Sequence, residues 1–154
     1  MKLTHMDNGG PSMVDVGDKD ETTRTAKAAC IVRVGEEAAA AIRQGSVKKG
    51  SPLAVAELAG IMGAKKTPEL IPLCHPLGID HVAVRCRLVE DRVEISASVR
   101  STGRTGVEME AMTAAAIAGL TVYDMCKSVS KGITIEEIRL VEKTGGKSGT
   151  YSAG

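Results

Sequence analysis

The stretch DHVAVRCRLVEDRVEISASVR, residues 80–100, decides the fold class of this chain. Apolar and polar residues alternate through both halves, which is typical of strands with one buried and one solvated face. Glu90 and Asp91 separate the two halves and predict the turn of an antiparallel hairpin. We therefore expect an antiparallel sheet whose buried face is covered by other elements.

The segments around this hairpin supply two more strands and three helices. The helix that begins after Ser51 has good start signals, with Ser51 as N-cap and Pro52 at its first position. It is apolar nearly all the way round, so we expect it to be buried. In chain order the predicted elements are strand 25–34, helix 35–45, helix 51–66, strand 80–90, strand 91–100, helix 107–129 and strand 132–143. This order predicts an α+β, ferredoxin-like βαββαβ fold with an extra helix and with helices packed on one face of an antiparallel sheet.

Length and composition indicate a single domain. The chain has 154 residues, of which 43% are apolar and 25% charged, enough for one hydrophobic core. We predict one domain over residues 1–154, with an irregular N-terminal segment at 1–22 and a flexible glycine-rich tail at 145–154.

The charge and the residue types argue against several classes of protein. The net charge is +1, and there are two tyrosines but no Phe or Trp, so we expect no nucleic-acid partner. No apolar run approaches the length that spans a membrane, and MKLTHMDNGG lacks the apolar region of a signal peptide. The four cysteines contain no C-x-x-C pair, which argues against a zinc ribbon or redox dithiol. A cytoplasmic protein with reduced thiols and no membrane partner is the expectation.

The tail contains GGKSG (145–149), which resembles part of a phosphate-binding P-loop. That motif requires a glycine where Val141 stands and a helix after the Ser, and neither is present. Two interpretations of the tail remain. In one, its Lys147 binds an anion; in the other, the tail has no functional role.

The segment ELIPLCHPLG (69–78) places Cys74 directly before His75, between two prolines. Neighbouring side chains diverge, so they make a poor metal site, and Cys/His catalytic partners are normally distant in sequence. A stiff, buried turn without chemistry is one interpretation. The other is a proline-stiffened loop that presents backbone groups and one imidazole to a polar ligand.

The long helix carries a stripe of polar residues. TGVE predicts a capping box, with Thr105 as N-cap and Glu108 three residues on. Glu110 and Asp124 lie further along the stripe, and Asp124 can touch Lys127 at i+3, which would tune both groups for proton transfer. A solvated helix face is the alternative. Glu110 and Asp124 are about 21 Å apart along the axis, so either one end is catalytic or sites form between subunits.

Several motifs together resemble the cyclic pyranopterin monophosphate synthases, the molybdenum cofactor biosynthesis protein C family. They are MVDV, KKG, AGIMGAKKTPELIPLCHPL, TGVEMEAMTAA, LTVYDMCKSVSKG and KTGGKSG, in order along nearly the whole chain. The resemblance implies a lyase that converts 3′,8-cyclo-7,8-dihydroguanosine 5′-triphosphate into cyclic pyranopterin monophosphate and diphosphate. It also implies a ferredoxin-like fold and a homohexamer, a trimer of dimers, with the site between subunits.

The resemblance also implies the site residues. The catalytic residues would be Asp124, Lys127 and Lys49. The substrate-binding residues would be Leu73, Cys74, His75, Glu108, Met109, Glu110, Arg24, Lys65 and Lys143. We expect the cations to surround the phosphates, and Glu110 and the His75 loop to hold the guanine-derived end.

We expect no resident cofactor and no metal ligands, although Mg²⁺ could accompany the triphosphate. The competing hypothesis is a non-catalytic, oligomeric module that binds nucleotides and regulates a partner, because ferredoxin-like folds serve both purposes.

Overall fold

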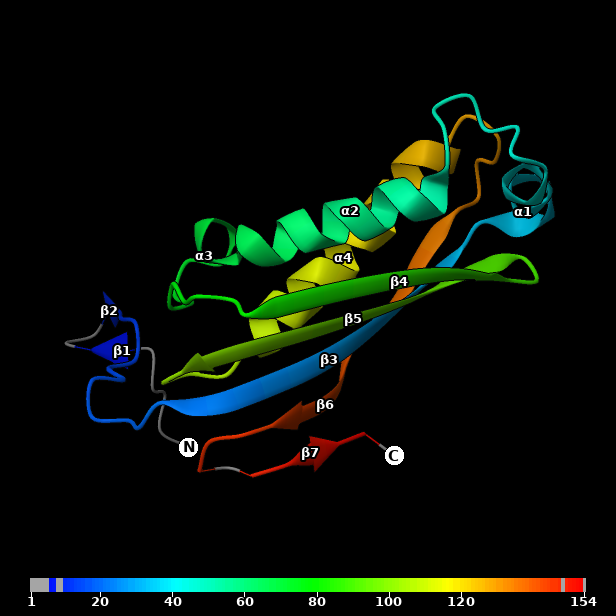
Figure 1. Ribbon diagram of the computed structural model, residues 1–154. Coiled ribbons are helices and arrows are strands. Elements are labelled where there is room, and N and C mark those ends of the chain that lie inside the picture. Colours follow the sequence, from blue (N-terminus) through cyan, green and yellow to red (C-terminus); the bar gives the residue numbers. More distant parts are fainter. Residues whose placement is uncertain (1–5, 8–9, 148, 154) are drawn as a thin grey trace.

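Five strands form one antiparallel sheet in the order β4-β5-β3-β6-β7, and β1 and β2 form a separate pair (Figure 1). The computed structural model describes residues 6–7, 10–147 and 149–153; parts of the predicted N-terminal segment and tail lie outside them. The strands are β1 (Met6–Asp7), β2 (Gly10–Pro11), β3 (Thr22–Arg33), β4 (His81–Val89), β5 (Arg92–Gly103), β6 (Thr134–Thr144) and β7 (Tyr151–Ser152). The helices are α1 (Gly35–Gln44), α2 (Pro52–Lys65), α3 (Thr67–Leu70) and α4 (Glu108–Cys126).

The hairpin predicted from residues 80–100 is confirmed. Strands β4 and β5 pair antiparallel from His81 opposite Arg100 to Val89 opposite Arg92. Glu90 in the turn has φ of 55°, a left-handed conformation that a short turn between twisted strands requires.

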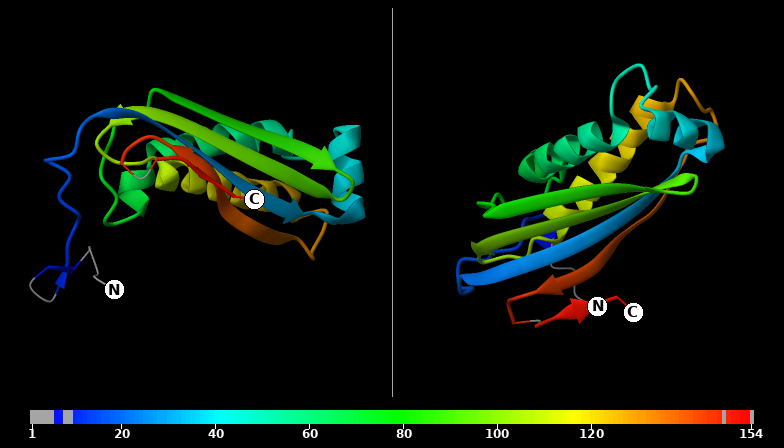
Figure 2. Two further views of the ribbon diagram at one scale, coloured as in Figure 1. Left: turned by 90° about the horizontal axis from the view of Figure 1, so that it is seen from below. Right: turned by 45° about the vertical axis from the view of Figure 1, so that its right-hand side comes forward.

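The ferredoxin-like arrangement with an extra helix is also confirmed. Strand β3 lies between β5 and β6, and both pairings are antiparallel. Helices α2 and α4 cover one face of the sheet in every view, whereas α1 lies beyond the end of the sheet near the β4–β5 turn (Figures 1 and 2). The extra helix predicted from the sequence is therefore α1, and the short α3 is a further helix that the sequence did not predict.

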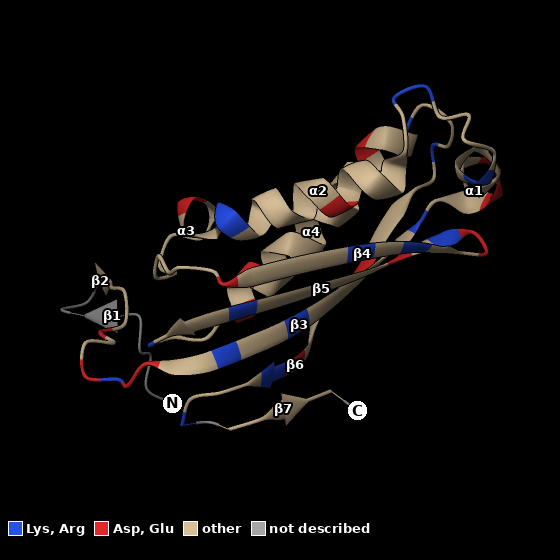
Figure 3. Ribbon diagram, viewed as in Figure 1, with Lys and Arg blue, Asp and Glu red and all other residues tan. Residues whose placement is uncertain are grey.

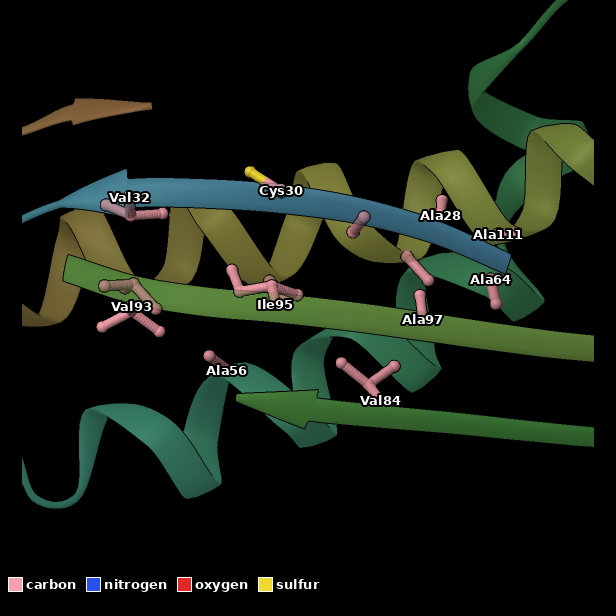
Figure 4. Close-up of a cluster of buried hydrophobic side chains, with 14 of the residues drawn as sticks. Ala28, Cys30, Val32, Ala56, Ala64, Val84, Val93, Ile95, Ala97 and Ala111 are labelled. Carbon is pink, nitrogen blue, oxygen red and sulfur yellow. The ribbon is translucent and has the colours of Figure 1, made fainter. Parts of the chain in front are cut away.

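The core lies between this sheet and helices α2 and α4 (Figure 4). Alternate residues of β3 are buried, because the strand turns every second side chain toward the helices. Alanines and valines fill the layer in place of aromatic rings. The buried side chains include Ala28, Cys30, Val32, Ala56, Ala64, Val84, Val93, Ile95, Ala97 and Ala111.

Two glycines allow α2 and α4 to approach closely. A Cβ atom on Gly60 would lie 3.0 Å from the carbonyl oxygen of Ala114, and one on Gly63 would lie 2.9 Å from Ile117. The small residues of the sequence thus hold the two helices and the sheet within contact distance, which positions both ends of α4.

The prediction that the helix after Ser51 is buried all round is wrong. Leu58 is 60% exposed and Met62 51% exposed, and Val55 is exposed on the same side. The single chain buries only the faces that meet the sheet and α4, so α2 presents apolar side chains outward. Among the described residues, no helix has the length and apolar character needed to cross a membrane.

Candidate active site

Three residues converge at the carboxyl end of α4. Asp124 lies in the last turn of the helix, Lys127 is its C-cap, and Lys49 comes from the loop between α1 and α2. One carboxylate oxygen of Asp124 lies 2.9 Å from Nζ of Lys127, and the other lies 3.2 Å from Nζ of Lys49. Lys49 also donates to the main-chain carbonyl of Asp124 at 3.1 Å. We call these three residues the lysine–aspartate cluster.

The two ammonium groups control the ionisation of this cluster. The hydrogen bond from Lys127, followed by that from Lys49, lowers the pKa of Asp124, so the carboxylate stays ionised. Asp124 in turn raises the pKa of Lys127. All three side chains are about half exposed, so a ligand can reach them from solvent. In such a cluster the carboxylate can accept a proton from a bound group, and the ammonium groups can donate protons to another.

A second group of residues lies at the amino end of α4. Glu110 is only 1% exposed, and its Oε2 accepts a hydrogen bond from Sγ of Cys74 at 3.5 Å. Its Oε1 is buried and has no hydrogen-bond partner within the part of the chain that the structure describes. Burial raises the pKa of Glu110. A buried carboxyl oxygen without a partner costs free energy unless a ligand satisfies it.

Cys74 remains a thiol at neutral pH. Burial, followed by the charge of Glu110 and the hydrogen bond to it, raises the pKa of Cys74 to about 11. The thiolate, not the thiol, is the nucleophile. The structure thus supports the sequence argument against a Cys74/His75 catalytic pair.

The predicted capping box at the start of α4 is wrong. The N-cap is Val107, and no side chain caps the helix. Glu108 instead accepts an ion-paired hydrogen bond from Lys143 of β6 at 2.7 Å. Burial raises the pKa of Glu108, but the hydrogen bond from Lys143, then a backbone hydrogen bond and the charges of Lys143 and Arg24, outweigh it and lower the pKa overall. We call Cys74, Glu108, Glu110 and Lys143 the carboxylate cluster.

The remaining residues of the predicted loop are placed differently. Nε2 of His75 donates to the main-chain carbonyl of Val14, which ties the loop to the MVDV segment. Leu73 is half-buried beside it, and Met109 lies exposed in the first turn of α4. His75 therefore supports the N-terminal segment in this structure, a contact that the sequence did not predict.

Arg24 belongs to a cationic pocket that the sequence only partly revealed. A pocket of about 300 Å³ is lined by Lys19, Asp20, Thr22, Arg24, Gly146 and Lys147. Nε of Arg24 donates to the carbonyl of Gly103 at 3.0 Å. A Cβ on Gly146 would lie 2.3 Å from the Arg24 guanidinium, and Gly146 has φ of 76°, so only glycine lets the tail pass here.

The segment GGKSG, which is not a P-loop, brings Lys147 beside Arg24 in this pocket. Lys19 was missed, because an isolated lysine in an irregular segment carries no pattern.

Lys65 lies apart from these residues. It borders a separate hollow of about 420 Å³ with Ile61, Leu77, Ile79 and His81. Among the described residues, no hydrogen bond or ion pair joins Lys65 to either cluster.

The two clusters lie at opposite ends of α4, as the sequence predicted. Glu110 and Asp124 are separated by about 21 Å of helix axis. Within the described residues, no group of three or more His, Cys, Asp or Glu side chains could hold a metal ion. One subunit thus has the lysine–aspartate cluster at the carboxyl end of α4. At the amino end it has the buried carboxyl group of Glu110, with basic side chains nearby.

Known proteins resemble the chain over nearly its whole length. Residues 13–146 match the model of the MoaC family. A cyclic pyranopterin monophosphate synthase of Rhodospirillum rubrum is 57% identical over 154 residues, covering 98% of this chain and 93% of the relative. Proteins of the same name from Novosphingobium aromaticivorans and Peptoclostridium acidaminophilum are 56% and 49% identical over 152 residues, each alignment covering 98% of this chain and 97% of the relative. The chain belongs to the MoaC family.

Proposed function

We propose that this protein is a lyase that converts 3′,8-cyclo-7,8-dihydroguanosine 5′-triphosphate to cyclic pyranopterin monophosphate and diphosphate, in molybdenum cofactor biosynthesis. The proposal rests on the ion pairs of Asp124. Its carboxylate lies between Lys49 and Lys127, and all three side chains are exposed enough for a ligand to reach them. Rearranging a purine-derived ring into a pterin requires positioned acids and bases, and this cluster contains both. The names of the relatives support the same reaction.

The proton-transfer roles follow from charge. Asp124 is the only carboxylate of its cluster and acts as the base. Lys49 and Lys127 are the acids, and they also stabilise negative charge on the reacting groups. The lysines keep Asp124 ionised, so it is ready to accept a proton at neutral pH.

The cyclisation step requires cationic side chains around the phosphates and does not require a nucleophile from the protein. In the cyclisation, a hydroxyl oxygen of the substrate forms a bond to the α-phosphorus, the bond from that phosphorus to the diphosphate oxygen breaks, and diphosphate leaves. The hydroxyl proton passes to a base. We assign the phosphate groups to the pocket of Arg24, Lys19 and Lys147, assisted by Lys143, with Lys65 as a further candidate.

A buried hydrogen-bond acceptor of the protein is available to the guanine-derived end of the substrate. The unpartnered Oε1 of Glu110 can accept from an N–H group of the substrate. Cys74 would orient Glu110 through its hydrogen bond, and Leu73, His75 and Met109 would shape the surrounding wall. The division between base-binding and phosphate-binding residues fails if Arg24→Ala leaves triphosphate affinity unchanged while His75→Ala removes it.

The site is proposed to be shared between subunits of a homohexamer built as a trimer of dimers. About 21 Å separates the clusters within one subunit, and a two-fold pairing of subunits would bring opposite ends of two α4 helices together. The exposed apolar side chains of α2, with Leu120 and Tyr123 of α4, provide a surface for such pairing.

Turnover tests the function directly. The purified protein, incubated with the cyclised triphosphate, should release diphosphate and form the pterin product in equal amounts. A regulatory nucleotide-binding module would bind the triphosphate and leave it intact. Binding without diphosphate release therefore refutes the enzyme and favours that alternative.

Mixing two variants of strongly reduced activity, assayed at a triphosphate concentration below KM, tests the shared site. If each site combines the lysine–aspartate cluster of one subunit with the carboxylate cluster of another, mixing Lys49→Met and Glu110→Gln subunits should restore about a quarter of the wild-type rate. Mixing Lys49→Met with Asp124→Asn should restore none, because both residues belong to the same cluster. Equal recovery in both mixtures, or a monomer by light scattering, would contradict the shared site.

The remaining expectations are also proposals. We propose that residues 1–154 act as one cytoplasmic domain, and that the protein contributes no metal ligands, so that any magnesium ion enters with the triphosphate of the substrate.

A further inference from the structure

The face of the sheet that points away from α2 and α4 is strongly cationic, and we call it the open face. Its basic side chains are Lys27, Arg33, Arg85, Arg87, Arg92, Arg100 and Arg139. Its carboxylates at paired positions are Glu94, Glu136 and Glu142. Basic residues appear on all four long strands (Figure 3). Because the whole chain has a net charge of only +1, the excess on this face is a local asymmetry.

Among the described residues, Arg85, Arg100 and Arg139 of the open face have no acidic partner, and two of them, Arg85 and Arg139, line one hollow. Arg87 and Arg92 both pair with Glu94, at 2.8 and 3.2 Å. By contrast, Arg85 donates to the carbonyl of Val84, and within the described residues neither Arg85 nor Arg139 forms a salt bridge. Their guanidinium groups can therefore accept an outside anion without breaking an existing pair.

These two arginines stand at the ends of one row across the sheet. Arg85 lies opposite Ser96, Ser96 opposite Ala29, and Ala29 opposite Arg139. Three strand spacings place the two ends about 14 Å apart. Since the middle residues are short, a hollow of about 420 Å³ forms, with Arg85, Arg87 and Arg139 at its walls and Ile31 in its lining.

We propose that this hollow is a docking site for an acidic segment of a partner protein. Carboxylates of the segment pair with Arg85 and Arg139, whose planar forks match a carboxylate in two hydrogen bonds. A small apolar side chain of the segment rests on Ala29 and Ile31. Arginine around a small apolar centre is typical of protein interfaces.

Other occupants fit the open face less well. Sheets that bind single-stranded nucleic acid stack bases on aromatic rings, and the two tyrosines of this chain lie outside the four long strands. A second copy packed face to face would bring arginines against arginines.

The docking site is separate from the candidate active site. The carboxylate and lysine–aspartate clusters involve α4, on the other side of the sheet (Figure 2). A partner on the open face would leave both clusters uncovered, so docking and turnover can be measured independently.

The test is the affinity for a short, fluorescein-labelled peptide of glutamates around a central leucine, measured by anisotropy. The Arg85→Glu/Arg139→Glu variant should bind at least about tenfold more weakly than wild type, because two attractive pairs become repulsive. The Arg43→Glu/Lys66→Glu variant makes the same change in net charge on exposed positions off this face and should keep wild-type affinity. Both variants should retain wild-type turnover, which shows that they fold.

Two results would overturn the proposal. One is equal loss of peptide binding in both double variants, which would mean that only net charge matters. The other is tighter binding of a DNA duplex or an anionic lipid vesicle than of the peptide, through the same two arginines, which would assign the face to a different macromolecule.

Discussion

Lys49 donates to both the carboxylate and the main-chain carbonyl of Asp124, although 75 positions separate the two residues in the sequence. The loop after α1 reaches over the end of α4 to make this contact. Two hydrogen bonds to one residue fix the ammonium group more firmly than an ion pair alone, which suits a proton donor whose position matters.

Asp124→Asn should lower the turnover rate by about 10²–10⁴-fold, the usual contribution of a positioned acid or base. The side chain is about half exposed, so thermal unfolding should change little. Steady-state diphosphate release and a melting curve measure the two effects. Asp80→Asn is the control, since this exposed carboxylate at the start of β4 contacts Thr102 and neither cluster. Near-normal turnover of Asp124→Asn would remove Asp124 from the mechanism.

Lys49→Met should shift the pH dependence of kcat/KM as well as lower the rate. Lys127 and Lys49 both lower the pKa of Asp124, so removing one of them raises that pKa toward its ordinary value. A base works only when deprotonated, and the acidic limb of the profile should therefore move to higher pH. Lys48→Met, at the exposed neighbour, should leave the profile in place. An unmoved acidic limb in Lys49→Met would contradict Asp124 as the base.

Glu110→Gln should change both binding and the pH dependence of stability. Burial raises the pKa of Glu110 in the folded state. The folded protein then holds this proton more tightly than the unfolded chain, whose Glu pKa is about 4.3, so the stabilising contribution is present at low pH and is lost as pH rises. Urea unfolding at several pH values should show a smaller decline for Glu110→Gln than for wild type. KM for the triphosphate should rise, and an unchanged KM would separate Glu110 from substrate binding.

The thiols should react slowly with iodoacetamide. Burial raises the pKa of Cys30 to about 11 and that of Cys86 to about 12, and Cys74 also has a pKa of about 11. At neutral pH their thiolate fraction is then about two orders of magnitude or more below that of a free cysteine. Mass spectrometry should find these cysteines unmodified in the folded protein and alkylated in urea. Rapid labelling of Cys74 in the folded state would show a thiolate there.

Gly60→Ala should destabilise the fold although alanine favours helices. A Cβ at this position meets the Ala114 carbonyl and Val84 at 3.0 Å, so α2 and α4 must separate. We expect a loss of about 1–3 kcal/mol in the free energy of unfolding, as for other overpacked cores. Gly132→Ala is the matched control, because no atom lies within 4 Å of its added Cβ. Equal stability of the two variants would show that the helices can yield.

The local features of this protein were determined by the sequence alone. Alternation in residues 80–100 predicted the hairpin, and Ser51 with Pro52 predicted the start of α2, which Ser51 caps through its hydrogen bond from Ala54. The contact between Asp124 and Lys127 followed from their spacing on one helix. Such features depend on neighbours within a turn or a strand, and the physical rules for them are short-range.

Other features were decided only by the tertiary structure. Glu108 had the spacing of a capping box but pairs with Lys143, because β6 brings a full charge closer than the helix cap could offer. Likewise, Glu110 appeared to belong to a polar stripe, yet the loop of Cys74 covers it and leaves one oxygen unpaired. The identity of Lys49 as the second partner of Asp124 depends on where a distant loop folds back. These contacts join segments far apart in the chain, and no local pattern encodes which of several lysines or carboxylates will meet.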